Sequence, residues 1–596
     1  MGIPLSLFGP STGLAVEQMV QAAMMSSVAV VVFAWGRQVI ADVWALVAAG
    51  LTLCIPGIAY SGMLMTETLF FPLVAVALWA LWRVLIQPSL ARQAVFLGAC
   101  ALAVLTRVQA LALLPAALLA IGLYCVFRRD VSVVRRLAPL LSLIVGGGIV
   151  ALALSRLSGG RVHVVGVYAA ATGGYEVGSS ARDVFWHTGA VFVIVAGVPL
   201  IALGVLVAEC ARGGESDTAA ALVATASAWT VVSLVEVGTF ASKWVDHIAE
   251  RDLITVAPPL FLVFALWLAR GIPRPQPLTA MIAMAVAAPA ILLPVSRFAT
   301  QESALDAFSF IPLWRLREAT SSASLELVYT VAVGLVVVAS VLVPRGARFG
   351  LVGLVACTLV LVTIVSSFQI QRLARADSAW VFSTAQPRWI DENANGPVTY
   401  VYAGTAVPQM LWKTVYWNER IERVLEFDGV PPAAPLPTRR AAPRVNGLVR
   451  DTAGHRLRGG YVVAPSNIVL AGTEVASYGP AADIPGLTLW RADAPLRVRW
   501  ITTGVQTNGD IAGAARVQVP GCTRGHLSLT LLGKAGAPVT ISVDGQDTRT
   551  VTPARNTARS VQIPAPASAN GTDACTYQIN TPGLTGTTRI EFVDGL

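Results

Sequence analysis

Long apolar segments alternate with short polar connections along the first two thirds of the chain. A helix needs about 20 apolar residues to cross a bilayer. About twelve segments approach or exceed that length, at roughly 14–36, 39–60, 66–86, 92–105, 107–127, 137–155, 185–211, 218–241, 252–270, 277–296, 323–343 and 348–370. No stretch of spanning length follows Gln371. The pattern therefore predicts a polytopic α-helical membrane domain over residues 1–371.

The last third of the chain shows two further patterns. Residues 372–495 are predicted to form a small α/β domain, because strand-like VTYVYAG (398–404) precedes helix-like VPQMLWKTVYWNERI (407–421) and strand-like GYVVAP. The Pro- and Arg-rich segment 430–444 is predicted to be a loop within it. Residues 496–596 alternate polar and apolar residues in short runs such as RVQV and VTISVDG between turn residues. That alternation predicts an antiparallel β-sandwich.

The composition supports an integral membrane protein. Of the 596 residues, 55% are hydrophobic and 13% are charged, whereas soluble domains carry about 25% charged residues. The net charge of +9 does not indicate nucleic-acid binding, because many arginines lie in short connections between apolar segments.

Arginines are concentrated in alternate connections of the membrane domain. These hold Arg37, Arg83, Arg92, Arg128, Arg129, Arg135, Arg136, Arg212, Arg270, Arg274, Arg345 and Arg348. The positive-inside rule makes this side cytoplasmic. The loops 156–184, 242–251 and 297–322 and the C-terminal region are then predicted to be extracytoplasmic, in a multi-pass plasma-membrane protein. An even number of spans also places the N-terminus outside, which predicts a helix ahead of Met1.

An acidic residue, Glu67, lies in SGMLMTETLFFP between two apolar segments on the predicted outer side. An ionisable group at the end of a membrane helix is a functional-site hypothesis, because the membrane makes it costly to retain. In the alternative interpretation, Thr66 caps the following helix and Glu67 complements the helix dipole.

A second polar group lies in the outer connection SKWVDHIAERDL, with Lys243, Trp244, Asp246, His247, Glu250 and Arg251. His247 and Arg251 are four residues apart and would share a face of one helical turn. Arginine binds phosphate oxygens through paired hydrogen bonds, so this loop could hold a lipid-linked phosphate. Arg107, in LTRVQ, lies on the same side. The alternatives are a solvated interfacial turn for the loop and a snorkelling side chain for Arg107.

The remaining chemistry-bearing residues are sparse. Five cysteines lie in apolar segments, whereas Cys522 and Cys575 lie in the polar C-terminal region. An oxidising compartment there predicts a disulfide between these two, with two unpaired thiols as the alternative. No cysteines or histidines have metal-ligand spacing. The outer loop 156–184 contains Tyr168 and Tyr175, which could line a polar cleft.

Three segments, PGIAYSGMLMTETLFFPL, GACALAVLTRVQALALLP and HIAERDLITVAPPLFL, occur in this order on one predicted side and precede a C-terminal outer domain. In these features the chain resembles the GT-C superfamily of polytopic glycosyltransferases, and in particular the family-39-like transferases related to protein O-mannosyltransferases and aminoarabinose transferases. The predicted β-sandwich resembles carbohydrate-binding modules attached to some arabinosyltransferases, at the level of fold.

The resemblance implies inverting transfer of a sugar from a polyprenyl-phosphate donor to a cell-envelope glycan, lipid or protein acceptor, on the outer face of a bacterial membrane. Such enzymes use a carboxylate of the first outer loop as the base. That loop would precede Leu14, and none of the thirteen residues before Leu14 is acidic. The expectation is therefore that the first helix and first outer loop are missing from this chain.

The resemblance also implies roles for individual residues. Glu67 would be a catalytic-site carboxylate that positions the acceptor or a divalent metal. Arg107, Lys243 and Arg251 would bind the donor phosphate, and His247 and Glu250 would order the donor-binding loop. Two other functions remain open, a transporter or lipid flippase and a non-catalytic glycan-binding envelope protein. A transporter is expected to show internal repeats and charged residues at mid-bilayer.

Overall fold

The computed structural model divides into two compact units, Met1–Ala376 and Asp377–Leu596, and each is described by itself. The structure describes residues 7–594 except 9, 64, 158–173, 214, 275–276, 383–385, 404–407, 428–435, 480–485, 507–508, 523, 535, 568 and 570–572. The predicted cleft residue Tyr168 lies outside the described residues.

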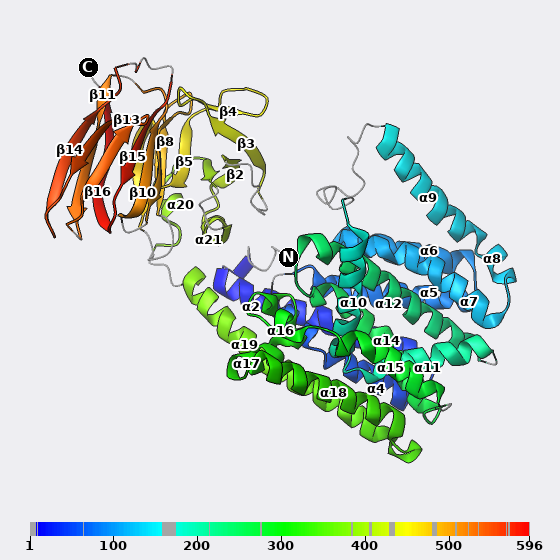
Figure 1. Ribbon diagram of the computed structural model, residues 1–596. Coiled ribbons are helices and arrows are strands. Elements are labelled where there is room, and N and C mark those ends of the chain that lie inside the picture. Colours follow the sequence, from blue (N-terminus) through cyan, green and yellow to red (C-terminus); the bar gives the residue numbers. More distant parts are fainter. Residues whose placement is uncertain are drawn as a thin grey trace. The chain divides into compact units, whose positions relative to one another are not determined.

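The first unit is built from helices alone in its described part (Figure 1). They are α2 (Pro10–Ser26), α3 (Val28–Gly36), α4 (Asp42–Leu53), η1 (Pro56–Gly62), α5 (Glu67–Ile86), α6 (Leu90–Thr106), η2 (Val108–Ala112), α7 (Leu113–Arg128), α8 (Ser132–Arg136), α9 (Ala138–Leu157), α10 (Val177–Ile194), α11 (Val198–Arg212), α12 (Asp217–Trp244), α13 (Glu250–Leu253), η4 (Ile254–Val256), α14 (Ala257–Ala269), α15 (Leu278–Ile291), α16 (Val295–Phe298), η5 (Ser303–Leu305), η6 (Phe308–Phe310), α17 (Ile311–Ala319), α18 (Ser322–Leu342), η7 (Arg345–Ala347) and α19 (Arg348–Phe382), where η marks a 3-10 helix.

Seven helical segments in the described part are long and apolar enough to cross a membrane, or up to nine if each of two bent pairs is one span. The bent pairs are α4 with η1 and α10 with α11. Helices α6, α15 and the apolar part of α9 are shorter. The first unit is therefore that of an integral membrane protein, and the predicted count of twelve spans is not confirmed.

The predicted single helix 185–211 is wrong, because α10 and α11 meet at an angle of 110°. The backbone turns at Ala196 and Gly197, with φ of 55° and 73°. A Cβ atom on Gly197 would lie 2.4 Å from the ring of Phe192. Glycine is therefore required there both for its positive φ and for the space that it leaves.

The helix α14 forms the centre of the bundle. Of the spanning window in Glu250–Ala269, 89% is buried, compared with 28% for Ser322–Leu342 and 22% for Arg345–Ala376. Helix α14 packs on α4 and α11, and α12 packs on α7 and α10. A Cβ on Gly238 would lie 2.6 Å from Cα of Val184, so a small residue lets α12 approach α10 closely, as in other membrane bundles. Helices α18 and α19 lie at the edge of the bundle (Figure 1).

The first part of the second unit is a seven-stranded mixed sheet with strand order β4-β3-β2-β1-β5-β8-β7. The strands are β1 (Val398–Tyr402), β2 (Ile421–Glu426), β3 (Thr438–Pro443), β4 (Val449–Asp451), β5 (Gly460–Pro465), β7 (Gly472–Tyr478) and β8 (Leu487–Ala492). Helices α20 (Trp389–Asn393) and α21 (Pro408–Trp417) accompany it. The prediction of a loop at 430–444 is wrong over β3, which pairs in parallel with β2 from Val424 to Glu426. Pairing with a strand overrides the weak local strand preference of a Pro- and Arg-rich segment.

The second part is a nine-stranded sheet that contains antiparallel pairs throughout. Its strands are β6 (Ile468–Leu470), β9 (Val498–Val505), β10 (Asp510–Val519), β11 (Gly525–Gly533), β12 (Val539–Val543), β13 (Gln546–Val551), β14 (Ala558–Pro564), β15 (Cys575–Asn580) and β16 (Thr585–Asp594). Burial alternates along β11 and β12, so one face of each strand lies in the core. The arrangement of these strands as two layers stays a prediction. Cys522 and Cys575 form a disulfide that joins the start of β15 to the segment before β11.

Candidate functional site

Glu67 begins helix α5, but it does not take part in a helix cap. Thr66 has helical backbone angles and makes no side-chain capping hydrogen bond, so the alternative in which Thr66 caps this helix is wrong. The Glu67 carboxylate is buried, with 7% of its side chain exposed, and its Oε1 lies 2.7 Å from Nη1 of Arg107. The carboxylate is thus directed into the protein rather than toward its own helix end.

Arg107 lies between α6 and η2 and joins two carboxylates from different helices. Its Nη1 donates to Glu67 at 2.7 Å, and its Nη2 donates to Oδ1 of Asp252 at 2.8 Å. The guanidinium carbon also lies 5.6 Å from the ring centroid of Phe70. Charge-assisted hydrogen bonds of this kind are strong, and here both terminal nitrogens are used. The interpretation of Arg107 as a snorkelling side chain is therefore wrong.

Arg251 and Asp306 extend this network. The Arg251 guanidinium lies 3.5 Å from Glu67 through Nε and 3.2 Å from Oδ1 of Asp306 through Nη1. The Arg251 amide also donates to the Asp306 carbonyl at 3.0 Å. Asp306 lies between η5 and η6, so it comes from a loop that follows α16 in the chain. We refer to Glu67, Arg107, Arg251, Asp252 and Asp306 as the ion-pair cluster.

His247 contacts the ion-pair cluster through Asp306. Its Nε2 atom lies 2.7 Å from Oδ2 of Asp306, and no described residue hydrogen-bonds to its other ring nitrogen. Burial by itself raises the pKa of Asp306, but the hydrogen bond from His247 and the charge of Arg251 together lower that pKa below its ordinary value of 3.8. Asp306 is therefore ionised at neutral pH and can orient the imidazole.

Glu250 is adjacent to Arg251 in sequence but faces away from the ion-pair cluster. It is fully buried, and its two carboxylate oxygens accept from the amide and the hydroxyl of Ser309, each at 2.8 Å. These bonds fasten α13 to η6. Glu250 therefore positions α13 against η6, and its carboxylate is too buried for a sugar donor to reach.

A buried histidine, His187, which was not selected from the sequence, hydrogen-bonds to the connection that contains His247 and Glu250. The Ala249 amide donates to Nε2 of His187 at 3.2 Å, so this nitrogen carries no proton. Nδ1 then donates to the Asp183 carbonyl at 2.7 Å. His187 is completely buried in α10. His187 is an isolated histidine in an apolar segment, and nothing in the neighbouring sequence indicates that it contacts this connection.

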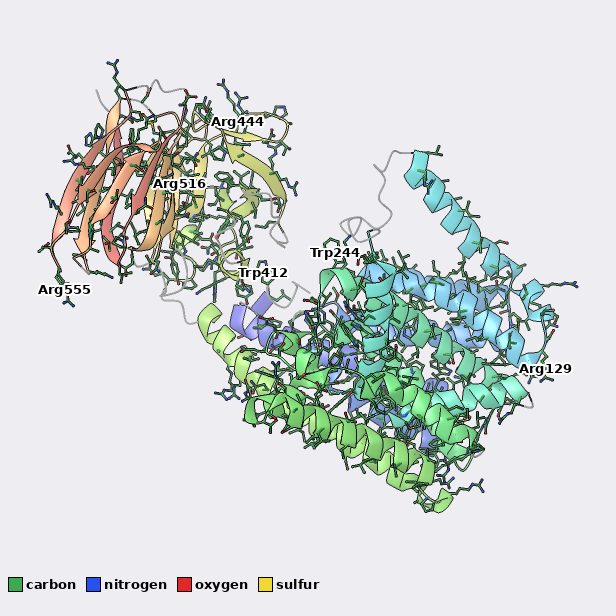
Figure 2. The ribbon with its side chains drawn as sticks, viewed as in Figure 1. Arg129, Trp244, Trp412, Arg444, Arg516 and Arg555 are labelled. Atoms are coloured by element: carbon green, nitrogen blue, oxygen red, sulfur yellow. A yellow bond between two sulfur atoms is a disulfide. The ribbon has the colours of Figure 1, made fainter. Side chains whose placement is uncertain are left out.

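Lys243 lies at the end of α12, beside aromatic side chains. Its Nζ lies 5.4 Å from the ring centroid of Tyr175 and 5.0 Å from that of Trp244. Figure 2 shows Trp244 and Arg129 at opposite ends of the helical bundle. This separation follows from the antiparallel packing of α7 and α12, in which Nη2 of Arg128 lies 2.6 Å from Asp217.

The ion-pair cluster contains three carboxylates and two guanidinium groups. It opens partly to solvent, since the exposed fraction of the side chain is 33% for Arg251 and 23% for Asp306. One carboxylate is therefore in excess over the guanidinium groups. Within the described ranges no three His, Cys, Asp or Glu side chains are placed to hold a metal ion.

Asp252 and Asp306 are the functional candidates that sequence reasoning did not select. Asp252 lies inside the quoted segment HIAERDL, next to the selected Arg251. Asp306 lies in the loop 297–322, which carries no motif, and is 59 positions from His247. Acidic residues are common in loops and at helix ends, so neither position by itself marks a functional site.

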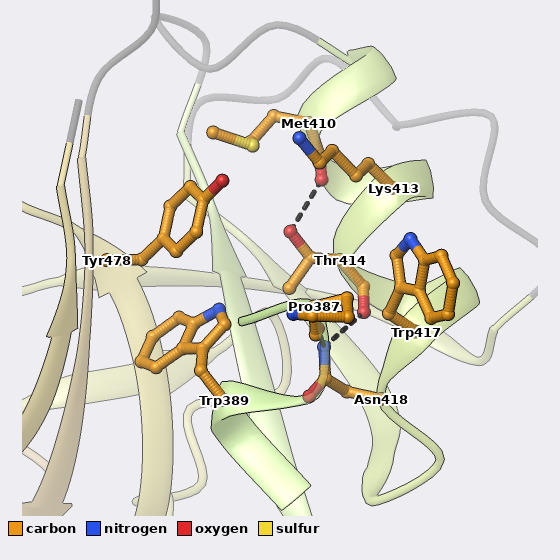
Figure 3. A pocket seen from close by; sticks show the side chains of 8 residues that line it. All are labelled: Pro387, Trp389, Met410, Lys413, Thr414, Trp417, Asn418 and Tyr478. Atoms are coloured by element: carbon orange, nitrogen blue, oxygen red, sulfur yellow. Dashed lines mark hydrogen bonds between the residues drawn. The ribbon is translucent and has the colours of Figure 1, made fainter. Parts of the chain in front are cut away.

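The second unit contains a small hollow between α20, α21 and β7 (Figure 3). The rings of Trp389 and Tyr478 stack there, with centroids 6.0 Å apart. Burial lowers the pKa of the Lys413 amine, whose Nζ lies 5.9 Å from the Tyr478 ring. The hollow has a cavity volume of about 10 Å³, far below the roughly 300–1,000 Å³ of ligand pockets. Its side chains therefore serve packing. It is lined by Pro387, Trp389, Met410, Lys413, Thr414, Trp417, Asn418 and Tyr478.

Comparison with known proteins identifies no family for this chain. No protein-family model matches the chain, and no curated protein matches it. Among solved structures, the cryo-EM structure of arabinosyltransferase EmbB from Mycobacterium smegmatis is similar, with a TM-score of 0.30 and 12% identity. The match covers 96% of this chain and 57% of that chain. A similarity of this size does not assign an activity to this chain.

Proposed function

We propose that the chain is a bacterial membrane glycosyltransferase whose reaction centre is the ion-pair cluster together with His247. The observation that carries this proposal is the convergence of five charged side chains from α5, the α6–η2 junction, α13 and the η5–η6 loop, at one end of a membrane bundle. Charged groups are costly in this setting and usually mark a functional site.

The location of the ion-pair cluster supports a lipid-linked donor. Glu67 begins α5 and Arg107 ends α6, so the cluster lies where spanning helices meet the aqueous phase. A polyprenyl phosphate keeps its hydrocarbon chain in the bilayer and its phosphate at this boundary. The opposite helix ends carry Arg83, Arg128 and Arg270, which favours placing the cluster on the extracytoplasmic side of the plasma membrane.

The two arginines have different proposed roles. Arg107 uses both terminal nitrogens on Glu67 and Asp252, so it positions these carboxylates. Arg251 is more exposed and contacts Glu67 and Asp306 through Nε and Nη1. Arg251 can therefore bind the phosphate of the donor, and Lys243, from the same outer connection, is proposed to assist it.

The proposed reaction is a single displacement. His247, oriented by Asp306, takes the proton of an acceptor hydroxyl. The acceptor oxygen bonds to the anomeric carbon while the bond from that carbon to the phosphate oxygen breaks. Polyprenyl phosphate leaves with its charge stabilised by Arg251, and the anomeric configuration inverts. Because two guanidinium groups engage the Glu67 carboxylate, Glu67 is proposed to position the acceptor on an envelope glycan, lipid or protein.

The test is sugar transfer by the full chain in membranes, from radiolabelled polyprenyl-phosphate pentose and hexose donors to endogenous acceptors. Loss of the base in His247→Gln should lower kcat by about 10²- to 10⁴-fold. Arg251→Gln should raise KM for the donor by about ten- to a hundredfold, the cost of a hydrogen bond to a charged group.

Glu302→Gln is the matched control, since Glu302 is exposed and lies in the same outer loop as Asp306. It should retain the activity of the natural chain. If no donor supports transfer above the background of membranes without the chain, the proposal is wrong. Equal loss of activity in all three variants would also contradict it.

One observation favours a second candidate function. Both arginines of the ion-pair cluster already contact carboxylates, so the cluster could serve only to fasten the helix ends together. The chain would then be a non-catalytic envelope protein. In that case the cluster variants would lose thermal stability, and no sugar transfer would be detected with the natural chain.

A further inference from the structure

An open cleft lies in the second unit, between the strands β9 and β16 and beside the turn that precedes β6. Its cavity volume is about 620 Å³, within the roughly 300–1,000 Å³ of ligand pockets. All the described residues that line it belong to one compact unit. The cleft is therefore the size of a ligand pocket, with room for a few linked rings.

One wall of the cleft presents an aromatic side chain, Trp500 of β9. Its exposed fraction is 7%, and the guanidinium carbon of Arg499 lies 5.3 Å from its ring centroid. No described residue accepts a hydrogen bond from its indole N–H. Most of the Trp500 ring packs in the hydrophobic core of the sheet, so the group that it leaves for a ligand at the cleft is its polar indole N–H.

A buried acceptor without a partner lies beside it. The side-chain amide nitrogen of Asn467 donates to the Thr502 carbonyl at 3.1 Å, which sets the orientation of that amide. Its oxygen, Oδ1, is buried and has no hydrogen-bond partner in the described part of the chain. A buried acceptor left unpaired costs about 1–3 kcal/mol. A ligand hydroxyl that reached this oxygen would remove the penalty, whereas an anion without a proton could not.

The other lining groups are neutral and polar. Hydroxyl groups come from Thr502, Thr503 and Thr588, and an amide comes from Gln506. The charged side chain that lines the cleft is Arg589, and its Nε donates to Glu591 at 2.9 Å. The arginine charge is thus balanced next to the cleft. Hydroxyl and amide groups both donate and accept hydrogen bonds, so they match a neutral ligand that is rich in hydroxyl groups.

We propose that this cleft binds a neutral oligosaccharide, with one sugar hydroxyl accepting from the Trp500 indole N–H and another donating to Asn467. The inference uses residues of the second unit alone and does not depend on whether the membrane bundle transfers sugar. It assigns the cleft an envelope glycan rather than a lipid phosphate or a nucleic acid, because those ligands require an uncompensated positive charge.

The experiment is isothermal titration calorimetry of the full chain in lipid nanodiscs, which avoids detergents with sugar headgroups. The probes are neutral arabino-, manno- and gluco-oligosaccharides of four units, with a tetragalacturonate and inorganic phosphate as charged comparisons. Saturable binding of at least one neutral probe is expected. No binding of any neutral probe, or tighter binding of the charged probes, would overturn the proposal.

Variants then locate the site. Thr502→Val with Gln506→Ala removes two polar groups of the cleft and should weaken binding by at least about tenfold, at roughly 1 kcal/mol for each lost hydrogen bond. Thr540→Val is the matched control, because Thr540 lies on β12 and does not line the cleft. Equal binding by the double variant and the control would place the ligand elsewhere and refute the assignment. Circular dichroism of both variants checks that they remain folded.

Discussion

The imidazole Nε2 of His247 lies 2.7 Å from Oδ2 of Asp306, although 59 residues separate the two in the chain. Asp306 also contacts Arg251 through its other oxygen, Oδ1, at 3.2 Å. One carboxylate therefore ties the α12–α13 connection to the loop before η6. The same contacts set the protonation of Asp306 and the orientation of His247.

This relationship predicts a pH dependence of stability. The pKa of Asp306 is lowered in the folded protein, so its ionised form stabilises the fold above its ordinary pKa of 3.8. The contribution is lost as the pH falls through the lower folded pKa. At pH 7, Asp306→Asn should therefore lower stability by about 1–3 kcal/mol. The difference between Asp306→Asn and the natural chain should be constant well above pH 3.8 and should shrink as the pH falls below that value.

The measurement is the apparent unfolding midpoint of both proteins in nanodiscs between pH 3 and pH 8. Glu302→Gln serves as the control, because its exposed carboxylate should add no such dependence. If the difference in unfolding midpoint between the two proteins stayed constant across this range, the ionisation of Asp306 would not be coupled to folding.

Arg107 is predicted to hold the end of the bundle together. Arg107→Ala would leave Glu67 and Asp252 buried without their shared cation, and breaking a buried pair in this way costs about 3–5 kcal/mol. We expect a clear fall in the apparent unfolding midpoint, followed by tryptophan fluorescence in nanodiscs. The double variant with Glu67→Gln should recover part of the loss, because one unpaired charge is then removed.

The control for Arg107 is Arg182→Ala, since 54% of the Arg182 side chain is exposed and its pairing with Asp183 is long, at 3.4 Å. Exposed pairs contribute about 0–1 kcal/mol. Similar destabilisation by Arg107→Ala and Arg182→Ala would contradict a central role for Arg107.

Glu236 is expected to destabilise the bundle. Its Oε2 is buried and accepts no hydrogen bond from the described residues, and it lies in the electrostatic field of Asp252 and Arg107. Glu236→Gln should raise stability by roughly 1 kcal/mol, because Glu236 must either be buried with its charge or take up a proton on folding, and a neutral amide has neither cost. Glu326→Gln should have the opposite effect, since Oε1 of Glu326 accepts from the Ser296 amide at 2.8 Å.

Both glutamine variants are compared by thermal unfolding and by the sugar-transfer assay. A more stable Glu236→Gln protein with unchanged transfer would assign this carboxylate no part in catalysis. A more stable but inactive protein would instead add Glu236 to the reaction centre.

The disulfide is predicted to stabilise the second unit. Cys522 and Cys575 are 53 residues apart, and closing a loop of this length stabilises a fold by about 4 kcal/mol in the chain-entropy model. Cys522→Ser with Cys575→Ser should therefore unfold at lower temperature and be cleaved faster by protease within residues 377–596. Cys357→Ser, which removes an exposed free cysteine, should change neither measurement.

Local patterns in the sequence determined the broad organisation of this protein. Hydrophobic segment length predicted a membrane bundle, because an apolar helix of spanning length is stable only when lipid or protein covers it. Period-two alternation predicted β structure at the C-terminus, since alternate side chains of a strand face opposite sides. The sequence also selected Glu67, Arg107, His247 and Arg251, because charged residues stand out at the ends of apolar segments.

The tertiary structure alone decided which partners these residues have. Arg107 contacts Asp252 across 145 positions and Glu67 across 40, and no local pattern records separations of this size. Glu250 and Arg251 are neighbours that were selected from the sequence for the same reason, yet the Glu250 carboxylate accepts hydrogen bonds from Ser309 and does not join the ion-pair cluster. Helix packing decides such directions, because a buried charge must find an opposite charge or a hydrogen-bond donor wherever the fold supplies one.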